Sequence, residues 1–352
     1  MKQIQDIDKN FVLKNIKPED DVVWFDVRTA PVDIYGFYNP KTEPRFHRLP
    51  KEVTDKCGDG VKALETHTAG GRVRFKTDSP YIAIKAEWPW RFKMANMSGS
   101  GSSGFDLFAR ENKNGQFYFL GAAMPPADGA DSGFDSKMRA EGEMCEYILS
   151  FPLYNTVSNL YIGIKRGCTL LAGEKYKIQK PFVYYGSSIT QGGCATRPST
   201  CYQAYISHRF DADFINLGFS GSALGEEAMA QYIAGLDMSA FILDYDYNAP
   251  TAEHLKATHL PFYRTVREKQ PDVPIVMVSR PHPVSEKSRD VIKATYDYAV
   301  AAGDKNVAFV DGGDLFKGDF YTNCTVDGCH PNDLGFYRMA TVIGNALEGL
   351  MR

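Results

Sequence analysis

The chain has 352 residues, of which 43% are hydrophobic and 24% are charged, and its formal net charge is −3. This much apolar surface can offset the entropy of the chain, so the composition indicates a globular protein and excludes a disordered one. The near-neutral charge provides no basic face, so we expect neither a nucleic-acid partner nor an anionic membrane as partner. No apolar run approaches the roughly 20 residues that a membrane helix needs.

Residues 1–15 read MKQIQDIDKNFVLKN and carry charges where a signal peptide has its apolar core. We therefore expect a cytoplasmic protein, although a secreted chain whose signal has been removed would look the same. Seven cysteines, an odd number in a long chain, fit reduced thiols better than a disulfide framework. A local disulfide, Cys194 with Cys201 or Cys324 with Cys329, stays an alternative, and neither spacing fits a structural zinc site.

The first half of the chain has the pattern of short strands. Between Val22 and Leu170, β-branched and aromatic runs are separated by clusters of Gly, Pro, Asp and Ser, and no long segment has a helical period. This pattern predicts a β-sandwich, jelly-roll-like, over residues 1–178. The Ser/Gly run at residues 98–104 is interpreted as a flexible loop. The clearest strand candidates are residues 22–27, 71–76, 81–86 and 160–164.

From about Lys180 onward, apolar strands alternate with amphipathic helices. This alternation predicts a second domain over residues 179–352, an α/β fold with a parallel sheet and helices on both faces. Such sheets bind ligands beyond the carboxyl ends of their strands, so chemistry is expected in the loops there. Strands are expected at residues 181–185, 213–217, 240–245, 274–279 and 306–310, and helices at residues 202–209, 226–234, 252–269 and 286–302.

Two serines follow the first of these strands, in the stretch YGSSITQGG at residues 185–193. Gly186 permits a tight reversal, and Ser188 follows where the loop enters a helix, so it can present its hydroxyl and its own amide as a nucleophile site. Serines after strands are also common caps and turns, so this loop alone is a weak indication. It is not the G-x-S-x-G elbow of α/β-hydrolases, because Thr190 stands where that motif needs glycine.

Two further strand-end loops offer donors for an oxyanion. Residues 218–223 read GFSGSA, and glycines at such a place can bring a bare amide close to a bound oxyanion. In the third loop, Asn248 can add a side-chain amide or, alternatively, cap a helix. Asp244 and Asp246 beside it could bind a cation instead, but no second acidic cluster completes the ligand shell of a hard ion.

The last loop, TNCTVDGCHPN at residues 322–332, is the most informative fragment. Asp327 and His330 are three residues apart on a turn that contains glycine. The carboxylate can therefore reach one imidazole nitrogen and leave the other facing the crevice. A lone histidine before proline is usually structural, but together with a strand-end serine this pair favours a catalytic role.

With all four loops in place, residues 180–350 resemble the SGNH/GDSL hydrolases, a family of serine esterases and lipases on a flavodoxin-like α/β/α fold. Two positions differ from the family pattern, because Ser187 and Ala249 replace aspartates that are not triad members. The stretches that carry the resemblance are GSSI at residues 186–189, NLGFSG at 216–221, DYNA at 246–249 and DGCHP at 327–331.

The resemblance implies a catalytic role for particular residues. Ser188 is the implied nucleophile, with His330 as the base and Asp327 as its orienting partner. The implied oxyanion hole consists of the amides of Ser188 and Gly221 and the side chain of Asn248. No metal or organic cofactor is implied.

The first half carries a shorter resemblance. GFDLF at residues 104–108 is similar to the Gly-x-Asp-Leu-Tyr element of a β-rich domain found ahead of some SGNH hydrolases, with Phe108 in place of tyrosine. Two-domain proteins of this layout are similar to carbohydrate esterases, which implies an acetylesterase acting on a small-molecule or oligosaccharide ester. Trp88 and Trp90, in an aromatic segment, are candidate sugar contacts, although a sandwich core also uses such residues.

Two alternatives stay open at this point. A lipase-like acylhydrolase or thioesterase would act on longer acyl chains, but the sequence has no hydrophobic helical lid. A carbohydrate-binding protein with a relic hydrolase domain would have no activity. The sequence gives no indication of the oligomeric state.

Overall fold

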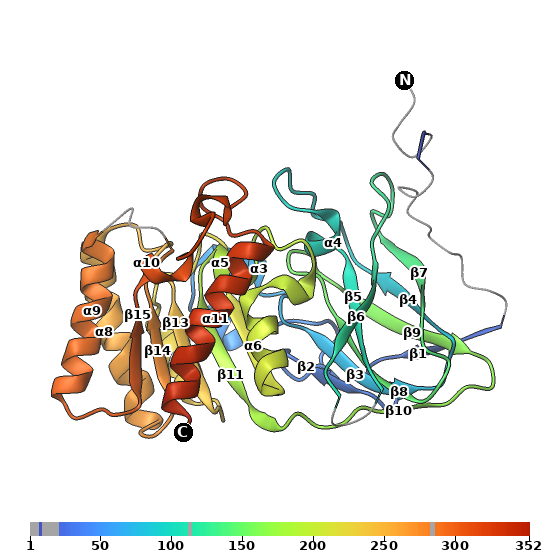
Figure 1. Cartoon of the computed structure of the whole chain (residues 1–352), viewed down its shortest axis with the longest axis horizontal. Coiled ribbons are helices and arrows are strands. Elements are labelled where there is room, and N and C mark those ends of the chain that lie inside the picture. The colour runs from blue at the N-terminus through green and yellow to red at the C-terminus, as the bar shows by residue number, and fades with distance from the viewer. Residues whose placement is uncertain (1–6, 9–20, 112–114, 282–285) are drawn as a thin grey trace.

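In the computed structural model a β-rich half and an α/β half lie side by side (Figure 1), and the structure describes residues 7–8, 21–111, 115–281 and 286–352. Within these ranges, no helix is long and apolar enough to span a membrane. The signal-peptide expectation concerns residues 1–15, most of which lie outside the described ranges.

Two antiparallel sheets form the β-rich half. The first has the order β1 (Val22–Asp26), β9 (Asn159–Lys165), β4 (Tyr81–Glu87), β7 (Gly133–Arg139), and the second the order β10 (Leu170–Ala172), β3 (Arg72–Thr77), β8 (Cys145–Ser150), β5 (Phe105–Arg110), β6 (Tyr118–Ala123), with β2 (Asp33–Tyr35) paired to β3. Alternate residues of the strands share one hydrophobic core, such as Ile82 and Ile84 from β4 and Phe75 from β3. The antiparallel β-rich domain is confirmed, while its jelly-roll connectivity stays a prediction.

The interpretation of residues 98–104 as a flexible loop is wrong. Residues Gly99–Ser102 form a short helix, α4, in which Ser100, Gly101 and Ser102 are buried. A Cβ on Gly101 would lie 2.1 Å from the carbonyl oxygen of Ala195, and the Ser100 hydroxyl donates to the carbonyl of Thr196 at 2.6 Å. The small residues are therefore needed for close packing against the α/β half.

The α/β half is built on a five-stranded parallel sheet. Its strands are β12 (Ala212–Gly218), β11 (Ile178–Gly186), β13 (Ala240–Asp244), β14 (Ile275–Val278) and β15 (Val307–Val310), in that spatial order. In chain order this is 2-1-3-4-5, the flavodoxin-like arrangement. All five strands agree with the expected ranges to within a few residues.

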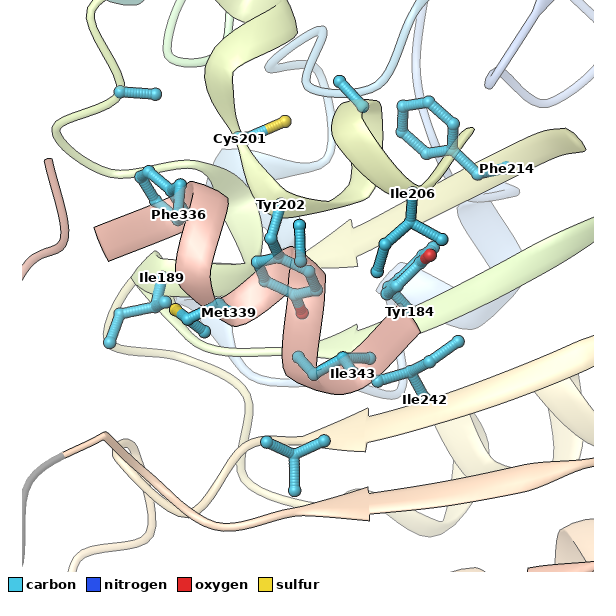
Figure 2. Packing of buried hydrophobic residues seen from close by; sticks show 14 of the residues in the cluster. Tyr184, Ile189, Cys201, Tyr202, Ile206, Phe214, Ile242, Phe336, Met339 and Ile343 are labelled. Carbon is cyan, nitrogen blue, oxygen red and sulfur yellow. The ribbon is translucent and has the colours of Figure 1, made fainter. Parts of the chain in front are cut away.

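Helices cover both faces of this sheet. They are α5 (Ser188–Gln191), α6 (Tyr202–Phe210), α7 (Glu227–Ala234), α8 (Ala252–Lys269), α9 (Glu286–Ala301), α10 (Gly312–Leu315) and α11 (Asp333–Leu350), with short 3-10 turns at Pro198–Thr200 (η2) and Tyr321–Asn323 (η3). Figure 2 shows one face, where Tyr184 of β11 packs with Tyr202 of α6 and Met339 of α11. The next residue of β11, Tyr185, enters the core under α7 and α8 instead. The four long helices expected from the sequence are present, and α11 was not anticipated.

The two halves share hydrophobic cores. Met97, Leu153 and Tyr154 of the β-rich half belong to the core beneath α6 and α11, and Leu49 and Val61 belong to the core on the opposite face of the parallel sheet. Two short helices, α2 (Lys51–Thr54) and α3 (Asp59–Leu64), lie in this linking region. The β-rich half is therefore packed directly against the α/β half.

Asp106 joins the two halves by polar contacts. This residue is the aspartate of the GFDLF stretch, and it is fully buried. Its carboxylate accepts hydrogen bonds from the backbone amide of Ser199 at 2.9 Å and from the Ser199 hydroxyl at 2.8 Å, in η2. Burial raises the pKa of Asp106, and the two bonds from Ser199 oppose that rise. The GFDLF stretch of the β-rich half is thus hydrogen-bonded to η2 of the α/β half.

Candidate active site

The strand β11 ends in a turn that separates the roles of the two adjacent serines. A Cβ on Gly186 would lie 2.0 Å from the carbonyl oxygen of Asp244, so only glycine fits there. Ser187 is fully buried, and its Oγ accepts the amide of Ile189 at 3.2 Å as the N-cap of α5. Ser188 is half-buried and is the first residue of that helix. Of the two serines, Ser188 is the one whose hydroxyl is not engaged in capping the helix.

A continuous hydrogen-bonded chain runs from Ser188 to the last loop. Ser188 Oγ lies 2.9 Å from Nε2 of His330, and Nδ1 of His330 lies 2.8 Å from Oδ2 of Asp327. The turn between aspartate and histidine is made by Gly328, whose φ is +84°. The structure thus brings together three side chains that are up to 142 residues apart in the sequence.

The carboxylate of Asp327 is held by several donors. Its Oδ1 accepts the amides of His330 at 2.8 Å and Cys329 at 3.1 Å, and its Oδ2 accepts the side-chain amide of Asn96 at 2.8 Å besides the imidazole. Burial acts to raise the pKa of Asp327, but the bonds from His330, Asn96 and Cys329 outweigh it and hold that pKa well below its usual value. The group is therefore a carboxylate at all pH values of interest.

The loop that follows β12 is fixed against α5. A Cβ on Gly218 would lie 2.1 Å from the amide nitrogen of Gln191, so strand and helix meet backbone to backbone. Gln191 Oε1 accepts the amide of Ser220 at 3.0 Å, and Asn248 Nδ2 donates to the carbonyl of Phe219 at 2.9 Å. Gly221 follows with φ +67°, in the left-handed region. Both expected donor loops therefore lie beside the helix that starts at the serine.

The three groups expected as oxyanion donors are available for such a role. Among the described residues, neither the amide of Ser188 nor that of Gly221 has a hydrogen-bond partner. One hydrogen of the Asn248 side-chain amide goes to Phe219, and the other is not used in that bond. Each of these three groups therefore has an N–H that no described hydrogen bond uses, as an oxyanion donor requires.

The aspartates considered as cation ligands have other partners. Asp244 is buried and accepts bonds from Thr190 and Tyr202, each at 3.2 Å. Asp246 is buried and pairs with Arg280 at 3.1 Å. Burial, with the nearby Asp246 charge, raises the pKa of Asp244 well above its usual value. Neither Asp244 nor Asp246 is exposed to bind a cation.

The two tryptophans expected at substrate have different environments. Trp88 is 3% exposed, packs on Phe134 with ring centroids 5.5 Å apart, and donates its Nε1–H to the carbonyl of Ala130. Its expected role as a substrate contact is therefore wrong, because its ring is buried in the core of the β-rich half. Trp90 is 55% exposed, and its contact with substrate stays a prediction.

The cysteines near the site are free thiols, including Cys194, Cys201, Cys324 and Cys329. The Sγ of Cys194 lies with Asp327 and His330 in a group whose donor atoms are within 4.8 Å of one another. A soft cation could bind there only by displacing the bond between Asp327 and His330. Metal binding at this place would therefore oppose the hydrogen-bonded chain that reaches the serine.

Residues of the β-rich half that sequence reasoning missed also support this site. Buried Arg48 donates to the carbonyls of Asn216 and Gly218 at the end of β12, at 3.0 and 2.6 Å. The hydroxyl of Tyr154 donates to the carbonyl of Ser188 at 3.1 Å. No motif or periodicity marks these residues, because their partners lie in another half of the chain and only folding brings them near.

His67 of the β-rich half orients a side chain of α5. Its Nδ1 lies 3.2 Å from Nε2 of Gln191, the residue whose Oε1 holds the loop after β12. Burial, and then the charge of Arg48, lower the pKa of His67 to about 3. His67 is therefore neutral and can accept the amide hydrogen of Gln191, which fixes which end of that amide faces Ser220.

Two family models match the chain and together span most of it. Residues 179–348 match the GDSL-like lipase/acylhydrolase family, and residues 22–170 match the GxDLY model, described as "N-terminus of Esterase_SGNH_hydro-type". The fold and these matches define a carboxylic ester hydrolase of the SGNH type. Residues 179–348 therefore form a GDSL-like lipase/acylhydrolase domain, with a GxDLY domain before it. No curated protein matches the chain.

Solved structures similar to this one cover the whole two-part layout. A protein from Bacteroides ovatus ATCC 8483 assigned as a GDSL-like lipase shares 28% identity, with a TM-score of 0.84 over 94% of this chain and 98% of that chain. The salicylyl-acyltransferase SsfX3 from a tetracycline biosynthetic pathway shares 18% identity, with a TM-score of 0.75 over 95% and 99%. An acetyl xylan esterase, Est2A, from the rumen bacterium Butyrivibrio proteoclasticus shares 12% identity, with a TM-score of 0.60 over 94% and 99%.

Proposed function

We propose that the protein hydrolyses small acyl esters, acetyl esters of carbohydrate foremost, through an acyl-enzyme on Ser188. The observation that carries this proposal is the unbroken chain from Ser188 Oγ through His330 to Asp327, with separations of 2.9 and 2.8 Å. It lies at the carboxyl ends of a parallel sheet, where such folds bind ligands.

In the first step, Ser188 Oγ attacks the ester carbonyl while Nε2 of His330 takes the hydroxyl proton. Asp327 keeps the hydrogen of the imidazole on Nδ1, so Nε2 presents a lone pair to the serine. The carbonyl oxygen becomes an oxyanion, which the amides of Ser188 and Gly221 and the side chain of Asn248 stabilise. The imidazolium then gives its proton to the departing alcohol.

In the second step, water takes the place of the alcohol. His330 removes a proton from this water, the resulting nucleophile attacks the acyl-enzyme, and the same three donors hold the second oxyanion. Collapse of this intermediate breaks the bond to Ser188 Oγ, returns the proton to it and releases the acid. The chain supplies every group that these steps use.

Asn248→Ala is expected to lower kcat about 100- to 1000-fold, with a small change in KM, because a donor aimed at the oxyanion acts mainly in the transition state. Steady-state hydrolysis of p-nitrophenyl acetate measures both constants. Asn248→Asp is the matched variant, since it keeps the shape but loses both amide hydrogens. A kcat for Asn248→Ala within a few-fold of the parent would remove Asn248 from the oxyanion hole.

Two observations support a carbohydrate ester as substrate. Trp90 and Phe92, 55% and 44% exposed, lie a few residues before Asn96, whose side chain contacts Asp327, and exposed aromatic faces suit sugar rings. An acetyl xylan esterase is also among the proteins of similar fold.

Acetate release from acetylated xylo- and gluco-oligosaccharides tests the substrate directly, with Ser188→Ala as the blank. The expected result is free acetate from at least one of these sugars, together with a steep fall in activity on p-nitrophenyl esters beyond acetate. A maximum at medium or long acyl chains would instead establish the lipase-like or thioesterase alternative.

A second outcome of the same assay is acyl transfer to an alcohol other than water. An acyltransferase is among the proteins of similar fold, and the acyl-enzyme described above can react with any alcohol that reaches it. Product analysis by mass spectrometry distinguishes the two reactions. We expect free acid, and an acylated acceptor formed in excess over acid would assign the protein to acyl transfer.

A further inference from the structure

Asn96 reaches into the active site from the β-rich half. It lies between β4 and α4, in a segment whose next residue, Met97, is 7% exposed and is part of the core beneath α6 and α11. The carbonyl of Asn96 accepts the thiol hydrogen of Cys194 at 3.2 Å. Burial of Met97 and this bond hold the backbone on the C-terminal side of the asparagine.

The side chain of Asn96 contacts the same oxygen that orients the imidazole. Its Nδ2 donates to Oδ2 of Asp327 at 2.8 Å, and that oxygen also accepts Nδ1–H of His330 at 2.8 Å. The side chains of Asp327 and His330 are 31% and 26% exposed, so water can compete for the carboxylate. A donor held on a separate part of the fold limits rotation of that carboxylate.

We propose that Asn96 is a positioning residue through which the β-rich half holds Asp327 in the orientation that directs His330 toward Ser188. The inference rests on the esterase mechanism proposed above. It assigns to the β-rich half a part in turnover that is separate from binding the substrate. Asn96 acts through Asp327 and does not itself reach the serine.

The charges around Asp327 make this role testable by pH. The groups that face Asp327 are His330, Asn96 and the thiols of Cys194 and Cys329. Burial, and then the nearby carboxylate, raise the pKa of Cys194 to about 11. Burial likewise raises the pKa of Cys329, so both thiols are neutral below pH 8.

Beyond Cys329 lie Tyr247 and Arg280, and Arg280 is paired with Asp246. The pKa of Tyr247 is raised, chiefly by burial, so its hydroxyl also stays neutral below pH 8. A carboxylate introduced at position 96 would therefore be the only new charge next to the Asp327–His330 pair. Any shift of the pH profile can then be assigned to that position.

The experiment compares Asn96→Ala and Asn96→Asp with the parent, using kcat and KM for p-nitrophenyl acetate from acidic to neutral pH. Asn96→Ala is expected to lower kcat about tenfold, the effect of one hydrogen bond to a charged group, and to leave KM nearly unchanged. Asn96→Asp keeps the shape of the side chain. Its added negative charge favours the imidazolium, so the acid limb of kcat/KM is expected to move to higher pH.

Asn345→Ala is the matched control. Asn345 is near the end of α11, and its exposed side chain accepts a bond from Arg209 at 2.9 Å, so the substitution also removes one surface hydrogen bond. We expect its kcat, KM and pH profile to equal those of the parent. Melting temperatures of all variants identify any effect that comes from loss of folding.

Three outcomes would overturn the inference. They are a parent-like kcat in Asn96→Ala, a loss confined to KM, and an acid limb in Asn96→Asp that does not move while activity falls. The last result would show a purely structural asparagine. Failure of the proposed function is distinct, because Ser188→Ala would then keep its activity whatever the Asn96 variants do.

Discussion

Ser188→Ala is expected to reduce kcat for p-nitrophenyl acetate roughly 100,000- to 1,000,000-fold, because the acyl-enzyme can no longer form. The residual rate would come from the donors and binding groups that remain. A fluorophosphonate probe, which labels an activated serine covalently, is expected to label the parent and not this variant. The rate measurement and the labelling both depend on the Ser188 hydroxyl, whose Oγ lies 2.9 Å from Nε2 of His330.

Ser187→Ala is the control that the sequence itself offers. Ser187 is fully buried and caps α5, so its loss is expected to cost about 1 kcal/mol of stability as a missing N-cap. Labelling should persist, and the rate should stay within about one order of magnitude of the parent if the nucleophile is elsewhere. A loss of labelling as complete as that of Ser188→Ala, in a folded Ser187→Ala protein, would overturn the assignment.

His330→Ala is expected to have an effect of similar size to Ser188→Ala, because nucleophile and base act as a unit and removing either disables both. Asp327→Asn is expected to cost less, roughly 10,000-fold in kcat, because it allows the wrong tautomer of His330 but leaves the base in place. Single-turnover acylation measures both variants. A His330→Ala protein that acylates at a rate near that of the parent would exclude His330 as the base.

The pH dependence of the parent follows from the environment of Asp327. The net effect of its donors holds the pKa of Asp327 below its usual value of 3.8. A carboxyl whose pKa is depressed in the folded protein keeps its charge above that usual value and loses it only as the pH falls further. A pH profile of kcat is therefore expected to show no loss from protonation of Asp327 between pH 7 and pH 5.

The β-rich half contributes side chains that contact residues of the candidate active site. Arg48 holds the end of β12, His67 orients Gln191, Tyr154 contacts the carbonyl of Ser188, and Asn96 contacts Asp327. Each contact joins one half to a loop that carries a proposed catalytic group. A catalytic half expressed alone would lack all four, since they belong to the other half of the chain.

Local patterns in the sequence predicted most of the α/β half. Alternation of apolar runs with amphipathic helices predicted its five parallel strands and four of its helices, but not α11, because the hydrophobic period directly reflects which face is buried. The strand-end rule then pointed to the loops that hold Ser188, Gly221, Asn248 and His330. The chemistry expected of these loops depended on residue types and short spacings, which the sequence contains.

Tertiary structure decided what local patterns do not encode. Residues 98–104 have the composition of a flexible linker, yet Gly101 is needed because a backbone carbonyl from another part of the chain lies where its Cβ would be. Tryptophan is a residue type that often stacks on sugar rings, but Trp88 is buried in the hydrophobic core.

The sequence by itself determined the sheet, its loops and the residue types of a serine-dependent site, because each depends on near neighbours in the chain. The family resemblance already named Ser188 as the nucleophile, but only the folded protein shows that its hydroxyl lies beside the imidazole while Ser187 is buried, and that Asn96 meets Asp327 from 231 residues away. The contact between Asn96 and Asp327 depends on how the two halves pack, and no period or spacing within either half specifies it.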